Sequence, residues 1–350
     1  MLIYNINLFV VYISLLLSRY LYIQKKNNIA SKILNLIMFI SICTISGLRY
    51  NVGTDYQAYV DIFSNINSYD FSNSQYEVGY IILNKLTRFI TNNDQMIFIV
   101  TSFIILFFIS RTVCKYSSRP EMSMFLFITL YFYYSSFNIV RQYIAIAIMF
   151  YGVRYILNRN FKRYIGCIII ALLFHTTAIY ALPIYFLPNK RLNNKVLIKS
   201  IIISIGVLIL INPIFKIITV VFPRYEYYGG GVLFNRGTYR SIIIIGSIFF
   251  ISYIYRYRII NIDKRNNLYI NAMFIAFIIS IVGIKSVLFI RIVSYFSLYS
   301  ILLIPNFIDI FKQKSKPIVY LLIISISYIY CYILLSINDG GVLPYMFRII

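Results

Sequence analysis

The side chains that usually hold metal ions are scarce in this sequence. Its 350 residues include one histidine and ten acidic residues, and no two aspartates have the Asp-x-Asp spacing of a metal-binding pair. The four cysteines lie inside or at the edges of apolar segments, and their spacing does not resemble a zinc site: Cys43, Cys114, Cys167 and Cys331. The sequence therefore indicates no metal centre and no cofactor.

Charged residues are also few. They make up 12% of the chain, against 60% hydrophobic residues and a mean hydropathy of +0.79, which is far too apolar for a soluble globular domain. The net charge of +23 would suggest nucleic-acid binding in a soluble protein. Here most basic residues fall in short loops between apolar runs, where membrane orientation accounts for them. Nucleic acid is not an expected partner.

No cleavable signal peptide is evident, because the first apolar run lacks a basic region before it and a small-residue cleavage site after it. A helix needs about 20 residues to cross the hydrocarbon core. Ten runs qualify: roughly 2–23, 30–48, 95–113, 121–137, 138–157, 196–222, 241–258, 268–284, 286–310 and 317–337. The predicted fold class is all-α, a polytopic integral membrane protein with about ten transmembrane helices.

Two further segments do not fit a simple span. The segment 78–90 is too short to span the membrane and carries Asn84, Lys85 and Arg88, so we expect an interfacial or re-entrant helix. Residues 164–187 could cross once, but both flanks are basic, which a single crossing would not allow under the positive-inside rule. We expect a broken or re-entrant hairpin that bends near His175 and Pro183. A single span with local exceptions is the alternative.

With that hairpin, the basic clusters all fall on one side of the membrane, which is then the cytoplasm. The extracytoplasmic loops are expected at about 49–94, 223–240 and 338–350. The first of these opens with one arginine and four acidic residues between Leu48 and Val78, against the basic character of the whole chain. No internal repeat is evident, and residues 1–350 are predicted to form one transmembrane domain in the cytoplasmic (inner) membrane.

A minority of basic residues lies on the outer side, against the orientation rule: Arg49, Arg141, Arg224, Arg236, Arg240, Lys285, Arg291 and Arg348. The planar donor fork of arginine binds phosphate oxygens bidentately. Several such groups at one leaflet suggest an anionic ligand, and a lipid-linked pyrophosphate fits. The alternative is that each one snorkels to the interface or pairs with an acid.

Polar residues interrupt two of the apolar segments. Asn138, Arg141 and Gln142 open the helix in FNIVRQYIAIAIMF and share one helical face. A charge at membrane depth is costly, so Arg141 is more often part of a site than a stabilising group. His175, in LLFHTTAIYALP, marks the predicted irregular backbone. It could be a general base, a phosphate donor or a cap at the helix break.

The segment LRYNVGTDYQAYVDIF follows the second apolar run. Asn51 and Gly53 allow a turn, and Asp55 and Tyr59 then share one helical face, so Asp55 could point back to Arg49. A carboxylate near a phosphate-binding arginine would suit activation of a sugar hydroxyl. A capped interfacial helix in a tyrosine belt is the simpler alternative.

These motifs resemble the EpsG family of exopolysaccharide polymerases, which are Wzy-type polymerases. The resemblance rests on RYNVGTDYQAY, YEVGY, VRQYIAIAI, FHTTAIYALP and a tail ending in LPY, from about residue 47 to 345. It implies an integral-membrane glycosyltransferase of GT-C type, acting outside the cytoplasm on undecaprenyl-pyrophosphate-linked repeat units of an O-antigen, capsule or exopolysaccharide. The family pattern implies these site positions: Arg49, Gly53, Asp55, Tyr59, Glu77, Tyr80, Arg141, Gln142, His175 and, more weakly, Tyr345.

Our hypothesis from the sequence is that Arg49, Arg141 and Arg291 bind the pyrophosphate leaving group, with Tyr295 on the same helical face as Arg291. Asp55, Glu77 or His175 would accept the proton of the attacking hydroxyl. The expected partners are the lipid-linked glycan donor and acceptor, membrane lipid and a chain-length regulator.

Two other functions stay open at this stage. A repeat-unit flippase would be expected to show structural repeats, which the sequence lacks. An O-antigen ligase would share the outward arginines and the same donor, and only the family resemblance separates it from a polymerase.

Overall fold

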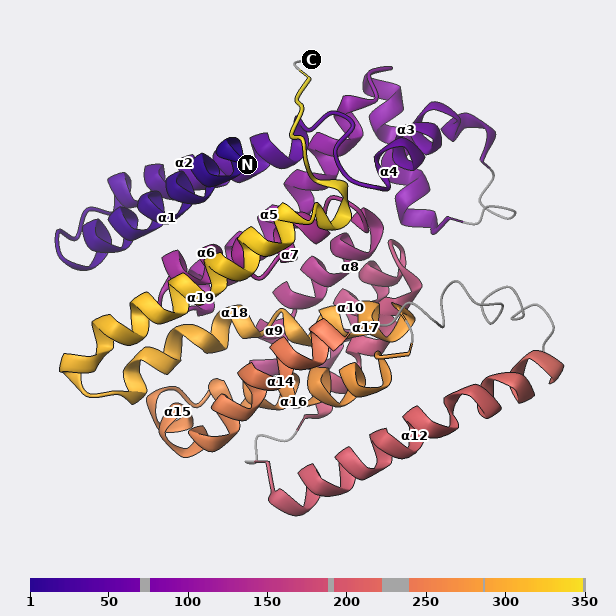
Figure 1. The fold of residues 1–350 in the computed structure, drawn as a ribbon. Coiled ribbons are helices and arrows are strands. Elements are labelled where there is room, and N and C mark those ends of the chain that lie inside the picture. Colours follow the sequence, from indigo (N-terminus) through magenta and orange to yellow (C-terminus); the bar gives the residue numbers. More distant parts are fainter. Residues whose placement is uncertain (70–75, 188–191, 222–238, 286, 349–350) are drawn as a thin grey trace. The chain divides into compact units, whose positions relative to one another are not determined.

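The computed structural model describes residues 1–69, 76–187, 192–221, 239–285 and 287–348. These residues form helices and no strand elements, as the sequence predicts, with one isolated antiparallel bridge between Arg49 and Phe347. The chain divides into two compact units, and Figure 1 labels their helices. Unit 1 holds residues 1–179 and 311–350, and unit 2 holds residues 180–310. The predicted 223–240 loop lies almost wholly outside the described residues, as do Arg224 and Arg236.

Unit 1 is built on long apolar helices. Helix α1 (Leu2–Ile23) packs against α2 (Asn28–Gly47) and α6 (Pro120–Thr129), and α2 packs against α5 (Gln95–Tyr116). Helix α5 in turn contacts α8 (Val140–Tyr151), which α9 (Val153–Leu157) extends, and α19 (Lys316–Ser336) lies beside α6. The outward faces of α1, α2 and α19 keep large apolar side chains exposed, as expected for helices in lipid.

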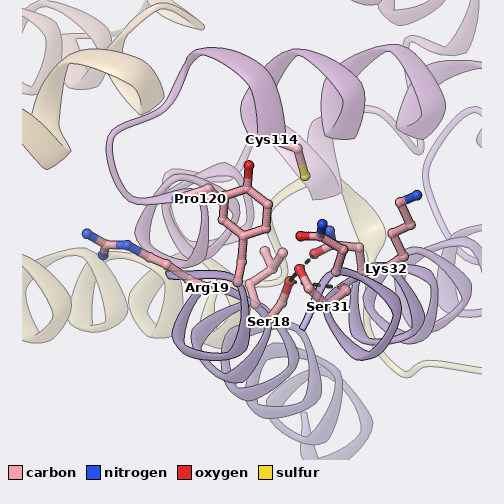
Figure 2. Close-up of a pocket in the computed structure, with 10 residues that line it drawn as sticks. Ser18, Arg19, Ser31, Lys32, Cys114 and Pro120 are labelled. Carbon is pink, nitrogen blue, oxygen red and sulfur yellow. Dashed lines mark hydrogen bonds between the residues drawn. The ribbon is translucent and has the colours of Figure 1, made fainter. Parts of the chain in front are cut away.

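The C-terminal end of α1 and the N-terminal end of α2 enclose a polar pocket in unit 1. Ser18 and Ser31 form a hydrogen-bonded pair there, beside Arg19 and Lys32, in a cavity of about 460 Å³ (Figure 2). Unit 1 also contains shorter elements. Two are α-helices, α3 (Tyr56–Ser64) and α4 (Val78–Ile90). Three are 3-10 turns: η1 (Ile66–Ser68), η5 (Gln313–Ser315) and η6 (Asp339–Gly341).

Six helices among the described residues are long and apolar enough to cross a membrane, and a bent pair would make seven. The predicted count of about ten is therefore not confirmed. The predicted 121–137 span is wrong as a continuous helix, because α6 stops at Thr129 and Tyr131 adopts a left-handed φ of 73° before the short α7 (Phe132–Ser135). The predicted 268–284 run forms α16 (Asn266–Val282), whose 17 residues are too few for it to count among the span candidates.

The backbone breaks at His175, as the basic flanks predict. Helix α10 (Phe161–Leu172) ends just before it, and two short pieces follow, η2 (Thr176–Ala181) and α11 (Pro183–Phe186). Whether this segment re-enters the membrane stays a prediction. Helix α4 covers the predicted residues 78–90 and is not among the span candidates.

Unit 2 is centred on α16. Helices α12 (Asn194–Val221), α14 (Tyr239–Ile254) and α17 (Val287–Ser297) pack against α16. Helix α15 (Arg256–Ile262) is bent from α14 by 78°, and α18 (Ser300–Leu303) runs into η4 (Ile304–Ile310). A buried hydrogen bond from Asn306 Nδ2 to Asn266 Oδ1, 3.1 Å long, ties η4 to the start of α16.

The C-terminal segment of unit 1 returns to the end of α2. The backbone N–H of Tyr50 donates to the Met346 carbonyl at 2.9 Å, and that of Gly53 donates to the Gly341 carbonyl at 2.9 Å. Gly53 has a φ of +103°, where a side chain would be strained, and a Cβ there would lie 2.6 Å from Asn138 Oδ1. The segment therefore fastens the loop that carries Arg49.

Helix α4 meets the break after α10 through Gly79. The Gly79 N–H donates to the Leu173 carbonyl at 2.7 Å, and a Cβ at Gly79 would lie 2.7 Å from that carbonyl oxygen. Only glycine allows this approach without a shift of the backbone.

The variant Gly79→Ala tests this contact. We expect a loss of about 1–3 kcal/mol of stability, because the added methyl group must push α4 away from α10. The control is Gly166→Ala in α10, where a Cβ would have no neighbour within 4 Å, so that stability is unchanged or slightly raised. Thermal unfolding of the purified protein in detergent measures both. Equal stability of the two variants would contradict the close packing.

Candidate active site

One carboxylate lies at the centre of the candidate site. Glu77 Oε2 is 2.5 Å from Arg141 Nη1, and Glu77 Oε1 is 2.7 Å from His175 Nδ1. The three side chains are 12%, 26% and 18% exposed, respectively. They are therefore largely sheltered yet open to a ligand. Of the predicted site residues, Glu77, Arg141 and His175 are in direct contact.

The three groups come from distant parts of unit 1. Glu77 sits in extended backbone immediately before α4, Arg141 is in the first turn of α8, and His175 follows the end of α10. The Gly79 contact with Leu173 holds the broken segment against the start of α4, and the Thr176 N–H lies 3.4 Å from Glu77 Oε1. The irregular backbone at His175 thus lets the imidazole reach the carboxylate.

Tyrosines position Arg141. The hydroxyl oxygen of Tyr59, which is buried in α3, accepts a hydrogen bond from the Val140 N–H at 2.9 Å and so caps the start of α8. The Arg141 guanidinium lies 5.1 Å from the ring centroid of Tyr76 and 5.9 Å from that of Tyr80, within range of a cation–π interaction. The predicted residues Tyr59 and Tyr80 therefore adjoin the site, but both are buried as supports.

The other polar residues near the start of α8 have different partners. Gln142 is buried in α8. Asn138 precedes the helix and its Nδ2 donates to the Gly340 carbonyl at 2.8 Å. Asn138 therefore holds the C-terminal segment, instead of sharing a ligand-facing surface with Arg141 as its spacing suggests.

The ionisation of Glu77 decides how this centre can act. Burial alone would raise its pKa, but the hydrogen bond from His175 and the charge of Arg141 outweigh burial and lower the pKa from 4.5 to about 2. A carboxylate this acidic is a weak proton acceptor at neutral pH. It also accepts hydrogen bonds only, so His175 Nδ1 carries the donated hydrogen. In neutral His175, Nε2 then holds the free lone pair.

Arg49 is placed differently from the sequence expectation. Its guanidinium is 1% exposed, donates to the carbonyl of Ser46 and, at 3.1 Å, to that of Phe137, and lies 4.8 Å from the ring centroids of Phe98 and Phe137. Burial lowers the pKa of Arg49 to about 10, so it stays charged at neutral pH. A pyrophosphate could not reach this group unless the surrounding side chains moved.

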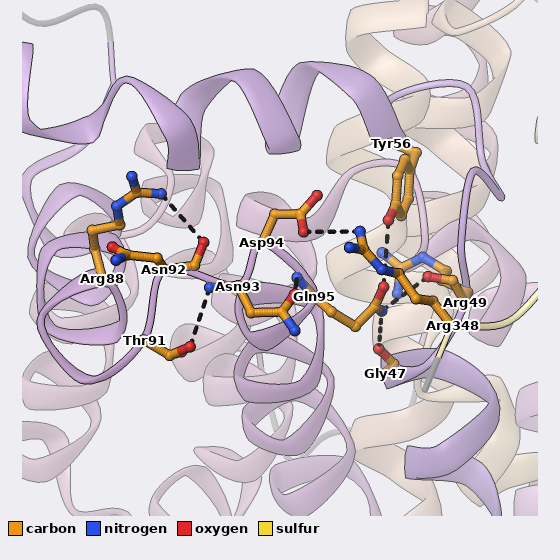
Figure 3. Close-up of polar contacts among 10 residues, drawn as sticks. All are labelled: Gly47, Arg49, Tyr56, Arg88, Thr91, Asn92, Asn93, Asp94, Gln95 and Arg348. Carbon is orange, nitrogen blue, oxygen red and sulfur yellow. Dashed lines mark hydrogen bonds and ion pairs between the residues drawn. The ribbon is translucent and has the colours of Figure 1, made fainter. Parts of the chain in front are cut away.

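A buried glutamine holds the loop that carries Arg49. Gln95 Nε2, at the start of α5, donates to the carbonyls of Gly47 and Arg49 at 2.6 and 3.0 Å, and the hydroxyl of Tyr56 lies 3.5 Å from Gln95 Oε1 (Figure 3). Nearby, Arg348 Nη1 is 3.3 Å from Asp94 Oδ1. Gln95 is not among the residues predicted from the sequence, although a polar residue that opens a long apolar helix was the available signal.

The remaining predicted residues lie apart from Glu77 or in the other unit. Asp55 precedes α3 and accepts a hydrogen bond from Thr54 Oγ1 at 3.1 Å, and no ion pair with Arg49 occurs in the described part of the chain. Tyr345 donates to the Ile45 carbonyl at 3.2 Å. Arg291 and Tyr295 lie one turn apart on α17 of unit 2, where Tyr295 is buried. Their predicted contact with pyrophosphate stays a prediction.

The chemistry of the centre follows from its groups. No cluster of three or more histidine, cysteine or acidic side chains that could hold a metal occurs in the described ranges. The centre instead joins a guanidinium, which binds anions, to an imidazole with a free nitrogen, which can take a proton. A carboxylate orients both. This combination suits transfer chemistry on an anionic leaving group.

The apolar helices indicate a multi-pass membrane protein, and its unit 1 holds a half-buried cluster of Glu77, Arg141 and His175. A family model described as the EpsG family matches residues 32–347, which include Glu77, Arg141 and His175. The chain therefore belongs to the EpsG family, as the motif resemblance predicts. That membership is consistent with a polysaccharide polymerase type of membrane protein. No match was found among curated proteins or among solved structures.

The depressed pKa of Glu77 gives a pH prediction. Because the folded-state pKa of about 2 lies below the ordinary 4.5, the ionised carboxylate stabilises the fold above about pH 4.5, and this contribution is lost as the pH falls toward 2. We therefore expect Glu77→Gln to unfold at a lower temperature than wild type at neutral pH, and the difference to shrink below pH 4.5. Asp61→Asn, at an exposed carboxylate on α3, is the control. A difference that is independent of pH would contradict the ion pairing.

A second prediction concerns Arg49. Replacement by methionine leaves the carbonyls of Ser46 and Phe137 without their buried donor, which costs about 1–3 kcal/mol for each unsatisfied group. We expect Arg49→Met to unfold at a clearly lower temperature in detergent. Arg348→Met, at a neighbouring arginine that is 48% exposed, should change stability by less than about 1 kcal/mol. An Arg49→Met protein as stable as Arg348→Met would show that Arg49 is not a structural support.

Proposed function

We propose that this protein is a membrane glycosyltransferase that polymerises undecaprenyl-pyrophosphate-linked repeat units into a surface polysaccharide outside the cytoplasm. The observation that carries this proposal is the contact of Glu77 with both Arg141 and His175 in a chain of the EpsG family. A polymerase must hold a lipid pyrophosphate and remove a proton from an attacking sugar hydroxyl. The centre contains one group suited to each task.

Arg141 binds the pyrophosphate of the glycan donor. Its Nη1 contacts Glu77, and the other N–H groups of its guanidinium have no hydrogen-bond partner among the described residues. The guanidinium fork can therefore bind phosphate oxygens and stabilise the charge that develops when the lipid pyrophosphate leaves. Tyr59 caps the start of α8 and the Tyr80 ring packs near the Arg141 guanidinium. Arg49 fastens the loop after α2 to the Phe137 carbonyl.

His175 accepts the proton of the acceptor hydroxyl. As its Nε2 takes the proton, the hydroxyl oxygen bonds to the anomeric carbon of the donor glycan and the bond from that carbon to the phosphate oxygen breaks. The electron pair of that bond leaves with the undecaprenyl pyrophosphate. Glu77 stays ionised throughout and stabilises the protonated imidazole, so it positions His175 and does not itself act as the base.

Sizing of surface glycan in cells tests the proposal. In a strain that lacks the gene, His175→Gln should leave single repeat units, because loss of a general base slows transfer by about 10²–10⁴-fold. Arg141→Lys should do the same, because lysine cannot bind phosphate bidentately. Arg88→Lys, at a half-buried arginine of α4, is the control and should restore the full ladder.

Three outcomes separate the possible functions. Single repeat units on the cell surface support a polymerase. Repeat units stranded on the inner leaflet would point to a flippase. A full-length ladder from His175→Gln, with wild-type amounts of protein in the membrane, would remove His175 from the mechanism.

A further inference from the structure

A second polar site lies at the other end of α2 from Arg49. The cavity of about 460 Å³ is lined by residues from the end of α1 and the start of α2, with Cys114 of α5 and Pro120 of α6 across from them. Helix α2 has 20 residues and is about 30 Å long at 1.5 Å per residue. The cavity is therefore separate from the Glu77 centre and has no part in the proposed transfer step.

The inner wall of the cavity presents hydrogen-bond donors. Ser18 Oγ lies 2.8 Å from Asn35 Oδ1 and 2.9 Å from Ser31 Oγ, and Ser18 and Ser31 are buried. Because the amide oxygen of Asn35 accepts from Ser18, its Nδ2 is the group left for a ligand. Nδ2 has no hydrogen-bond partner among the described residues. Two N–H bonds are thus available in a half-buried position.

The charge around the cavity is positive. Arg19 and Lys32 lie on opposite sides of the Ser18–Ser31 pair (Figure 2). Arg19 Nη1 contacts the buried carboxylate of Glu121 at 2.6 Å, so this pair is neutral, whereas Lys32 is exposed and has no ion-pair partner in the described ranges. The first turn of α2 also contributes the positive end of its helix dipole. One net positive charge and a set of donors favour an anion.

Apolar surface next to the cavity indicates where the anion comes from. Ile29, Ile33 and Leu36 of α2 are 74%, 53% and 55% exposed, on a helix apolar enough to span a membrane. Acyl chains can lie along this surface while a headgroup enters the polar cavity at the helix end. These apolar side chains would add no binding free energy for a soluble anion, which has no acyl chains to bury against them.

We propose that this cavity binds the phosphate of an anionic lipid headgroup, in the leaflet next to the α1–α2 turn. The Asn35 amide and the Lys32 ammonium contact the phosphate oxygens, and Arg19 contributes the N–H groups that Glu121 does not use. The acyl chains lie along α2. The site would be occupied whether or not the protein polymerises glycan.

The sharpest variant is Asn35→Asp. It keeps the oxygen that accepts from Ser18 but replaces the amide donors with a second carboxylate oxygen, so the phosphate meets a like charge. Native mass spectrometry of the full-length protein in detergent, titrated with phosphatidylglycerol, measures the bound lipid. We expect affinity to fall by about tenfold or more. Asn27→Asp is the matched control, because Asn27 caps α2 through its side-chain oxygen and does not line the cavity, and it should change affinity by less than about twofold.

The lysine is tested in parallel. Lys32→Gln should weaken phosphatidylglycerol binding by about fivefold, as expected for one lysine at an anionic headgroup, and Lys32→Arg should restore it. Lys25→Gln, in the turn between α1 and α2 but outside the cavity lining, should have a smaller effect. Unchanged unfolding temperatures exclude misfolding as the cause.

Three results would overturn the proposal. The first is wild-type affinity in Asn35→Asp and Lys32→Gln. The second is equal binding of zwitterionic phosphatidylcholine, because the cavity would then not select an anionic lipid. The third is displacement of phosphatidylglycerol by equimolar glycerol 3-phosphate, which would identify a soluble phosphate ester as the occupant. Because each readout is lipid binding, a failure here leaves the proposed polymerase activity untouched.

Discussion

The negative charge of Glu77 is the interaction on which the candidate site depends. A half-buried carboxylate needs partners, and this one takes a guanidinium from the start of α8 and an imidazole from the break after α10. To give the carboxylate these two partners, the chain must pack the start of α4 against Leu173 and fix the position of Val140, the first residue of α8. The glycine at position 79 and the hydroxyl of Tyr59 do this. Both contacts place a partner of the Glu77 carboxylate: Gly79 fixes the segment before His175, and Tyr59 fixes the start of the helix that carries Arg141.

Two arginines that look alike in the sequence therefore have different roles. Arg49 is enclosed by carbonyl oxygens and aromatic rings, and the C-terminal segment and Gln95 close over its loop. Arg141 shares one N–H with Glu77 and keeps the rest of its fork accessible. Arg49 donates to two backbone carbonyls and so ties two segments of the chain together, whereas an accessible arginine can bind a phosphate. The difference lies in burial and partners, which the residue type alone does not determine.

The sequence predicted the features that depend on local composition. Long apolar runs became α1, α2, α5 and α19, residues 78–90 became a short helix, and the basic flanks of 164–187 correctly indicated a break at His175. The sequence could not show the left-handed Tyr131 that divides the 121–137 run, because tyrosine has no marked preference for that conformation. Nor could it show that Glu77 meets His175, 98 residues further on, since such pairings are set by tertiary packing. The family resemblance, and not residue spacing, brought these two residues into one set of candidates.

The central claim is that Glu77 acts through His175 as one unit in glycan transfer. A double-mutant cycle on turnover of lipid-linked repeat units by the purified protein tests it most directly, with Glu77→Gln, His175→Gln and the double variant. If the account is right, the double variant is much faster than the product of the two single losses predicts, because the support that Glu77 gives the imidazole is already lost in His175→Gln and only its contact with Arg141 remains. If instead the two losses multiply, the carboxylate and the imidazole act independently, and the account is contradicted.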